Sequence, residues 1–416
     1  MVDRSYVMFL LILCVSQPGV PLHAAEVTSH AYALSEIVDL AMARHPAFAG
    51  AARLVEQSRG QQLAAAAYPN PSIAGSAGRG AIRDPSNGVS ILEHTVTVGQ
   101  PVEWPAKRAA RQRAANAGLA GAQAGLEETR LTVLADVKVA FYQLLLAQRD
   151  ADVATQNRAT VEDVLRTVKI RVSAGEATSF EAIKANVEVQ KARKEVSRAQ
   201  NALLVMRVKL NTVTAGALGK HFSIQGDFDP LRNEIDLESM TALAVERHPT
   251  IRRLRKLLEQ AEESVVEERE SRIPNLIVQG SYHREAGDQS IVAGLSVPIP
   301  LWYRRQGEIQ TALGAKHRIE AERLRAENDL ENAVTESVQE ARTAKEQIEV
   351  FEKGLLQQAE QALSIARVSF RQGAASLLDL LDAQRVYRQT LLEYAQARSA
   401  LAIAIARLER WTGGLP

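Results

Sequence analysis

The chain has 416 residues, and its 50 Lys and Arg are balanced by 49 Asp and Glu, which gives a formal net charge of +1 at pH 7. Proteins that bind nucleic acid through its phosphates are normally distinctly basic, so this balance argues against nucleic acid as a partner. Aromatic residues make up only 5% of the chain. Ala, Leu, Glu, Gln and Arg dominate instead, a composition typical of long packed helices.

The N-terminus has the pattern of an export signal. Arg4 precedes an apolar run from Tyr6 to Val15, and small residues follow at Ala24-Ala25. We therefore predict a signal peptide over residues 1–25. The apolar run is too short to span a bilayer as a helix, and we expect no later stretch to reach the 18 or so apolar residues that a membrane helix needs.

The only cysteine, Cys14, lies inside this apolar run. After cleavage, the chain would have neither disulfides nor thiolate metal ligands. Lipidation of Cys14 is an alternative, although Leu13 precedes it where a lipoprotein signal prefers a small residue. The eight histidines are scattered, and no nucleophile–base grouping is visible. We therefore predict no metal site, no cofactor and no enzymatic activity.

Sequence motifs recur about 200 residues apart. Arg44-His45-Pro46 returns as Arg247-His248-Pro249, and from Gly175 to Gly216 the spacing is constant at 198 residues, which pairs Gly175 with Gly373. Solenoid repeats are much shorter, roughly 20–50 residues. We therefore interpret the chain as a duplicated half and expect a pseudo-symmetric assembly. The predicted units are a first repeat at 26–220, a linker at 221–236 and a second repeat at 237–416.

Each half is predicted to begin with a short helical segment, at about 34–67 and about 237–272. A helix-boundary role is expected for His45 and His248, because each stands before a proline. Two strand-like stretches follow in each half. The second half alternates from Leu276 to His283 and from Ile291 to Ile299 around a turn at Gly287-Asp288, and the first half alternates from Leu92 to Val98 after Pro85-Ser86-Asn87-Gly88.

Each predicted strand has about nine to eleven residues, the length that crosses a bilayer as tilted β-structure. Two ordinary surface hairpins are the alternative. Four strands per chain cannot close a barrel, and an open sheet edge in lipid leaves its backbone groups unpaired. A membrane role therefore requires several chains to complete the barrel.

The remaining segments carry a heptad repeat of apolar residues. The seam positions are Val133, Val137, Ala140, Leu144, Ala147, Ala151 and Ala154 in one helix, and Ala182, Ala185, Val189, Ala192, Val196, Ala199, Leu203, Met206 and Leu210 in the next. The second series recurs 198 residues later, from Leu380 to Leu408. Such a repeat predicts coiled-coil packing. About 65–70 helical residues before Gly175 extend roughly 100 Å, so the molecule should be a rod.

The predicted helical hairpins turn at two similar sequences. Ser173 to Ser179 and Arg371 to Ser376 each provide a glycine where a helix must end, Gly175 or Gly373, and then Thr or Ser to cap the next helix. Both tips should point away from the strands.

Beyond the second turn, Asp379 and Asp382 are spaced to share one helix face. They are either a solvated acidic pair that the helix dipole favours, or a pore constriction that three copies complete as carboxylate rings, which favour cations. The 198-residue shift pairs Asp379 with Glu181 but Asp382 with Lys184. The first tip is therefore not a second acidic ring.

A set of short motifs occurs along the chain in a fixed order. They are the two-fold repeat, Pro69-Asn70-Pro71, Gln100-Pro101-Val102-Glu103 with Lys107-Arg108-Ala109-Ala110-Arg111, Pro298-Ile299-Pro300-Leu301 with Arg305-Gln306-Gly307, and Gly373 with Leu377 to Gln384. From about Leu34 to Gly414 the chain thereby resembles the outer-membrane efflux protein (TolC-like) family. The Gln100–Arg111 group is most similar to its heavy-metal-efflux (CzcC-like) branch.

This resemblance implies a mainly α fold with a small membrane β part. Long coiled-coil hairpins form an α-barrel through the periplasm, and four strands per chain complete a twelve-strand β-barrel in outer-membrane lipid as a homotrimer. It implies a periplasmic adaptor and an inner-membrane pump as partners. The expected adaptor contacts are Val172, Gly175, Thr178, Phe370, Gly373 and Ser376. The constriction falls on Asp379 and Asp382, whereas the family's latching arginine falls on about Ala375.

The expected function is a passive outer-membrane channel of a tripartite (RND-type) efflux system that exports metal cations or small toxic compounds. A type I protein secretion conduit has the same architecture and is one alternative. A periplasmic coiled-coil scaffold shares the helices but needs no membrane, and it is the other.

Overall fold

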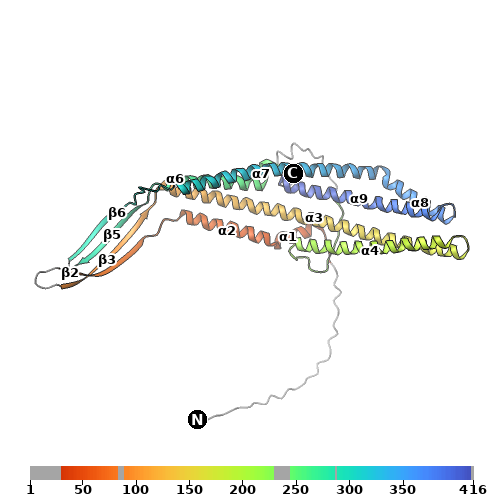
Figure 1. Ribbon diagram of the computed structural model, residues 1–416, viewed down its shortest axis with the longest axis horizontal. Helices are drawn as coiled ribbons and strands as arrows, with labels where there is room; N and C mark the ends of the chain where they lie inside the picture. Colours follow the sequence, from red (N-terminus) through yellow and green to blue (C-terminus); the bar gives the residue numbers. More distant parts are fainter. Residues whose placement is uncertain (1–29, 83–88, 229–243, 286–287, 414–416) are drawn as a thin grey trace, which may run out of the picture.

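The computed structural model describes residues 30–82, 89–228, 244–285 and 288–413. The protein is a long rod with a four-stranded sheet at one end and two helical hairpin tips at the other (Figure 1). The predicted signal peptide, Cys14, the turn at 85–88 and residues 229–236 of the predicted linker lie outside the described residues. The rod and its two tips at the end far from the strands confirm the prediction from the heptads.

Long helices account for most of the described chain, as predicted. The first half contains α1 (Leu34–Arg44), α2 (Pro46–Ala66), α3 (Pro105–Ser173) and α4 (Ser179–Val213), and the second contains α6 (Pro249–Glu270), α7 (Gln306–Val350), α8 (Leu356–Arg371) and α9 (Leu377–Thr412). Helix α3 has 69 residues and is therefore about 100 Å long. The predicted heptad positions of α3, α4 and α9 are all buried or half-buried, because they form the seams between these helices.

The repeated His-Pro pairs begin helices in both halves. The Nδ1 atoms of His45 and His248 accept hydrogen bonds from the backbone N–H two residues further on, at 3.1 and 3.2 Å. The proline that follows each histidine occupies the first helical position, where its missing N–H costs nothing. His248 is also buried, and its Nε2 lies 3.1 Å from the carbonyl oxygen of Arg410. The predicted helix-boundary role is confirmed for both.

The sheet consists of β2 (Ser72–Ile82), β3 (Val89–Val102), β5 (Leu276–Glu285) and β6 (Asp288–Ser296). All neighbours are antiparallel in the order β2-β3-β5-β6. The two halves thus contribute one hairpin each, and β3 pairs with β5 to join them. Strands β2 and β6 remain as open edges. A separate two-stranded parallel pair, β1 (Ala31–Tyr32) and β4 (Ser223–Ile224), lies among the helices.

The two faces of the four-stranded sheet differ in polarity. One face carries hydroxyl and imidazole groups that bond across the strands: Thr95 to His283 and Thr97 to Ser281, both at 2.9 Å. The other face is apolar, although it is largely exposed in one chain. Its exposed members are Ile73, Leu92, Val96, Val98, Val278, Ile291 and Leu295. We call these the polar face and the apolar face.

Charged pairs join the sheet to the helices. Glu103, at the end of β3, accepts two hydrogen bonds from Arg111 of α3, at 2.7 and 2.8 Å. These bonds lower the pKa of the Glu103 carboxyl. Trp104 donates from Nε1 to Glu270 at 2.9 Å, which fastens the same junction to α6. The motif residues around Gln100–Arg111 therefore join the sheet to α3 and α6.

The second half contains a break that the first half lacks. Residues Phe351–Leu355 form a π-helical turn, η1, between α7 and α8, and Gly354 there has φ of 141°. The turn is held by Tyr394 of α9, whose ring lies 5.8 Å from that of Phe351 and whose hydroxyl donates to Glu352 at 3.0 Å. Single π turns accommodate a local irregularity inside an otherwise regular helix. The equivalent stretch of α3 is continuous.

Helix α3 also contains an 18-residue window with a mean hydropathy of 1.3. The expectation that no stretch after the signal would be long and apolar enough to cross a membrane is therefore wrong for the described residues. Half of that window is buried within the protein, as in the core helix of a bundle.

Candidate functional site at the helical tips

The two tips share one backbone conformation. Gly175 and Gly373 have φ of 76° and 78°, the left-handed conformation that ends a helix and favours glycine. Their N–H groups donate to the carbonyl oxygens of Val172 and Phe370, each at 3.1 Å. The next N–H donates to the residue five positions earlier, at 2.8 Å in both tips. The predicted glycine-terminated turns are thus confirmed in the same hydrogen-bonded form.

The following helices are capped more completely in the second tip. Thr178 accepts from the N–H of Glu181 at 3.3 Å. Ser376 accepts from the N–H of Asp379 at 3.2 Å, and its own N–H and hydroxyl donate to the Asp379 carboxylate at 2.9 and 2.7 Å. This reciprocal pattern is a capping box. The bonds from Ser376 lower the pKa of Asp379, so this exposed side chain stays negatively charged.

Asp382 lies one turn further along α9 and is also exposed. Its carboxylate forms an ion pair with Arg385 on the same helix. Lys184 of α4 and Asp382 line one groove between the hairpins. The residue that interrupts the acidic pattern in the first half therefore lines the same groove as the second-half carboxylate. Within one chain the two aspartates thus differ, because Asp379 is held by a neutral serine and Asp382 by a cation.

An apolar cluster binds the two hairpins together just behind the turns. Its buried members are Val168, Ala185, Leu363, Phe370, Leu377 and Leu380. The side chain of Phe370 is only 3% exposed, so this predicted contact residue packs between the hairpins rather than outward. Gly175, Thr178, Gly373 and Ser376 are exposed, and Val172 is half-buried.

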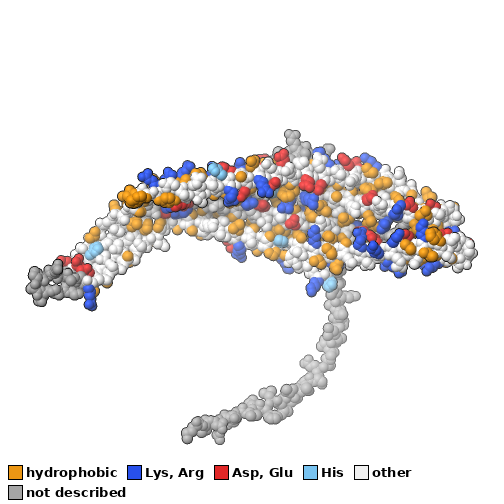
Figure 2. Space-filling view, in the orientation of Figure 1, with side chains coloured by type: hydrophobic (Ala, Val, Ile, Leu, Met, Phe, Trp, Pro, Cys, Tyr) orange, Lys and Arg blue, Asp and Glu red, His pale blue; other side chains and the backbone are white. Residues whose placement is uncertain are grey.

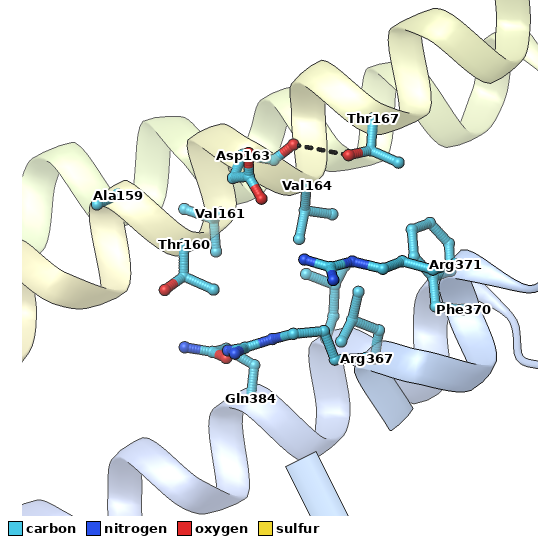
Figure 3. A pocket seen from close by; sticks show the side chains of 12 residues that line it. Ala159, Thr160, Val161, Asp163, Val164, Thr167, Arg367, Phe370, Arg371 and Gln384 are labelled. Carbon is cyan, nitrogen blue, oxygen red and sulfur yellow. Dashed lines mark hydrogen bonds between the residues drawn. The ribbon is translucent and has the colours of Figure 1, made fainter. Parts of the chain in front are cut away.

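A cavity of about 290 Å³ separates α3 from α8 and α9 beside this cluster. Figure 3 shows Arg367 and Arg371 extending into it from α8, facing Thr160 and Val164 of α3. Gln384 of α9 closes one side and donates to Asn157 of α3 at 3.3 Å. This cavity is therefore the weakly packed part of the contact between hairpins.

One contact between the hairpins was not predicted. Arg171 of α3 donates from Nη1 to the carbonyl oxygen of Phe370 at 3.4 Å, and its guanidinium carbon lies 5.3 Å from the centre of that ring. Ala375 stands where the family resemblance places a latching arginine. Arg171 provides a cationic link from the opposite hairpin. The repeat gives no signal for it, because its counterpart at 198 residues is Ser369.

The described residues contain no group of three or more His, Cys, Asp or Glu side chains placed to hold a metal ion. The site is thus made of turns, a shared apolar cluster and scattered charges. Such an arrangement can hold two hairpins together or let them separate, and it contains no grouping that suggests bond-breaking chemistry.

The sequence matches the family model described as outer membrane efflux protein over residues 37–216 and 241–414. It is 26% identical over 382 residues to the cobalt-zinc-cadmium resistance protein CzcC of Cupriavidus metallidurans, covering 91% of this chain and 90% of that protein. It is 23% identical over 341 residues to the pyoverdine export outer membrane protein OpmQ of Pseudomonas aeruginosa, covering 79% and 70%.

The fold is that of solved channels. The Campylobacter jejuni CmeC outer membrane channel superposes with a TM-score of 0.78 at 17% identity, covering 92% of this chain and 85% of that one. The sequence match spans both halves and so confirms the predicted resemblance. This family consists of transport channels rather than enzymes. The chain therefore belongs to the outer membrane efflux protein family, and it is an efflux channel of the outer membrane with a large periplasmic part.

Proposed function

We propose that three copies of this chain form the outer-membrane conduit of a tripartite efflux system for metal cations or small toxic compounds. The observation that carries the proposal is the open four-stranded sheet with one exposed apolar face. An open edge leaves backbone N–H and C=O groups unpaired, which lipid does not tolerate. When β6 of each of three chains pairs with β2 of the next chain, the twelve strands form a closed barrel.

In such a barrel the polar face lines a water-filled lumen and the apolar face meets lipid, the alternation found in outer-membrane barrels. The helices continue the conduit for about 100 Å into the periplasm. The exposed turn residues Gly175 and Gly373 then stand furthest from the membrane, where an adaptor attached to an inner-membrane pump would meet them (Figure 1).

The tip of the second hairpin supports the proposed constriction. Asp379 is exposed and its pKa is lowered by Ser376, so three copies would present negative charge. Carboxylate rings favour cations. Asp382 contributes less while Arg385 holds it.

The cargo is inferred from the two related proteins. One relative is a cobalt-zinc-cadmium resistance protein, and another exports pyoverdine. The described residues present no metal-holding cluster, so we expect a passive conduit whose pump selects the cargo. The greater coverage and identity of the first relative favour divalent metal cations.

The test combines assembly with resistance. The protein should be extracted from outer membranes as a detergent-dependent trimer, and deletion of its gene should sensitise cells to cobalt, zinc or cadmium. Restoring the gene should restore resistance. A water-soluble monomer would contradict the channel itself. A trimer whose loss changes sensitivity only to organic compounds would contradict the metal cargo but not the conduit.

A further inference from the structure

The charged side chains of the sheet are sorted between its two faces at the end far from the helices. Arg79 of β2, His94 of β3 and Arg284 of β5 share the parity of the apolar face. Glu93, Glu285 and Asp288 share the parity of the polar face. Figure 2 shows charged side chains gathered at this end of the sheet, beyond a stretch that is mainly white and orange. In the proposed barrel, the apolar face with the two arginines and His94 turns outward, and the polar face with the carboxylates turns inward.

His94 is a neighbour of both arginines. His94 lies directly opposite Arg284 in the β3–β5 pairing, and Arg79 lies opposite Leu92, two residues from His94. Opposed side chains have Cβ atoms about 5 Å apart and diagonal ones about 7–8 Å. We call Arg79, His94 and Arg284 the basic patch. Arg79 and Arg284 are exposed and His94 is half-buried.

The described strands offer the basic patch no acidic partner on its own face. Among the described residues, no ion pair links these three side chains to a carboxylate, and none of the outward-facing residues of the four strands is acidic. A neighbouring copy does not supply one either. The outward-facing residues of the β6 edge that would pair with β2 are Gln289, Ile291, Ala293 and Leu295.

The patch stands at the height of a membrane surface. Trp104, at the junction with the helices, is 42% exposed, and Trp302 at the neighbouring junction is 90% exposed. Tryptophan concentrates at membrane–water interfaces. His94 is ten residues before Trp104, about 33 Å along the strand at 3.3 Å per residue. A strand tilt of about 40° reduces this to about 25 Å, the height of the apolar band of outer-membrane barrels.

We infer that the basic patch binds the phosphate groups of the phosphorylated glycolipid in the outer leaflet of the outer membrane. The inference rests on the proposed barrel, since that assembly places the apolar face in lipid. Arg79 and Arg284 supply guanidinium groups, which suit bidentate contact with phosphate. Tyr282, two residues from Arg284 on the same face, places a phenol at the same level. The inward carboxylates meanwhile keep the same phosphates out of the lumen.

The test compares two lipids on the purified trimer in mild detergent. Binding of bisphosphorylated lipid A and of its enzymatically dephosphorylated form is measured by native mass spectrometry. The wild type should bind the phosphorylated lipid at least tenfold more tightly. The double variant Arg79→Gln/Arg284→Gln should lose most of that preference at low salt, because each arginine near an anionic surface contributes about a factor of five.

The matched control is Lys169→Gln/Lys194→Gln, which removes two exposed cations of α3 and α4 far from the sheet. This control should bind lipid A like the wild type, and Arg79→Lys/Arg284→Lys should retain most of the preference. Equal binding of both lipids by a trimeric wild type would overturn the inference and leave the conduit intact. If the glutamine variant fails to assemble, the wild-type comparison still decides. A chain that forms no trimer would instead contradict the proposed function.

Discussion

The two halves of the chain have similar backbone structures but differ in the contacts that their side chains make. Both contain a histidine-capped helix, both give one β-hairpin to the sheet, and both turn at a glycine with φ near 77°. At two matched pairs near the tips, however, the second-half residue makes the fuller contacts. Phe370 is buried where Val172 is half-buried, and Ser376 forms the fuller cap. Duplication has kept the turns and divided the contacts unequally.

The second hairpin supplies most of the buried residues that hold the tips together. Residues of α8 and α9 make up most of the buried cluster at the tips, while α3 and α4 contribute Val168 and Ala185. Substitutions at paired positions test this unequal share of contacts directly, because the first-half residue serves as the control for its second-half counterpart.

The largest difference is expected at Phe370 and Val172. Phe370→Ala removes a buried ring from the cluster between the hairpins and should lower the free energy of unfolding of the tip by about 3–4 kcal/mol. Val172→Ala should cost about 1 kcal/mol. Hydrogen exchange of α8 and α9 amides measures both. Equal costs would show that the two hairpins contribute equally to the cluster.

The histidine pair should differ less. His248→Ala removes a buried cap and the contact to the Arg410 carbonyl, and should cost about 2 kcal/mol, against about 1 kcal/mol or less for His45→Ala, whose side chain is only half-buried. Burial lowers the pKa of His248, so its neutral form stabilises the fold at neutral pH. That contribution should be lost as the pH falls from about 6.5 through the lower folded value. Denaturation at several pH values should show this for the wild type and not for His248→Ala.

The turn glycines should show no difference at all. Gly175→Ala and Gly373→Ala both force a side chain into the left-handed region and should each cost about 1 kcal/mol, since no atom lies closer than 4.0 Å to the added carbon. Melting temperatures of the two variants should fall together. A much larger fall for one would mean that its turn is packed against another copy in the trimer.

The smallest effect on stability, and the most specific effect on transport, is expected at Asp379. Asp379→Asn should reduce cation selectivity in planar bilayers, whereas Glu181→Gln should change it little. Because the hydrogen bonds from Ser376 lower the pKa of Asp379, wild-type selectivity should fade only at a pH below the usual titration range of an aspartate. Unchanged selectivity in Asp379→Asn would leave the capping box as the only role of this residue.

The sequence predicted the architecture well, because long heptads and alternating strands are periodic signals. The seam positions and the turns at Gly175 and Gly373 are confirmed. The break at Gly354 was not predicted, since one glycine in a heptad-rich helix has no periodic signature. The adaptor contacts and the constriction remain predictions.

Contacts between the hairpins could not be read from the sequence. The link from Arg171 to Phe370 and the pair Gln384–Asn157 join residues about 200 positions apart. Their meeting depends on how α3 packs against α8 and α9, which no local pattern specifies. The partner of Asp382 could not be predicted either, because Arg385 is one of several charged residues near it in the sequence.

The length of α3 has a consequence for how this protein can change over evolutionary time. Its 69 residues are matched by the 45, 5 and 16 residues of α7, η1 and α8, and both rods run from the sheet to the tips. A heptad inserted into one rod alone would leave the two turns about 10 Å out of step. The two rods must therefore keep matching lengths for the tips to stay level, so insertions and deletions should survive only when both halves change together.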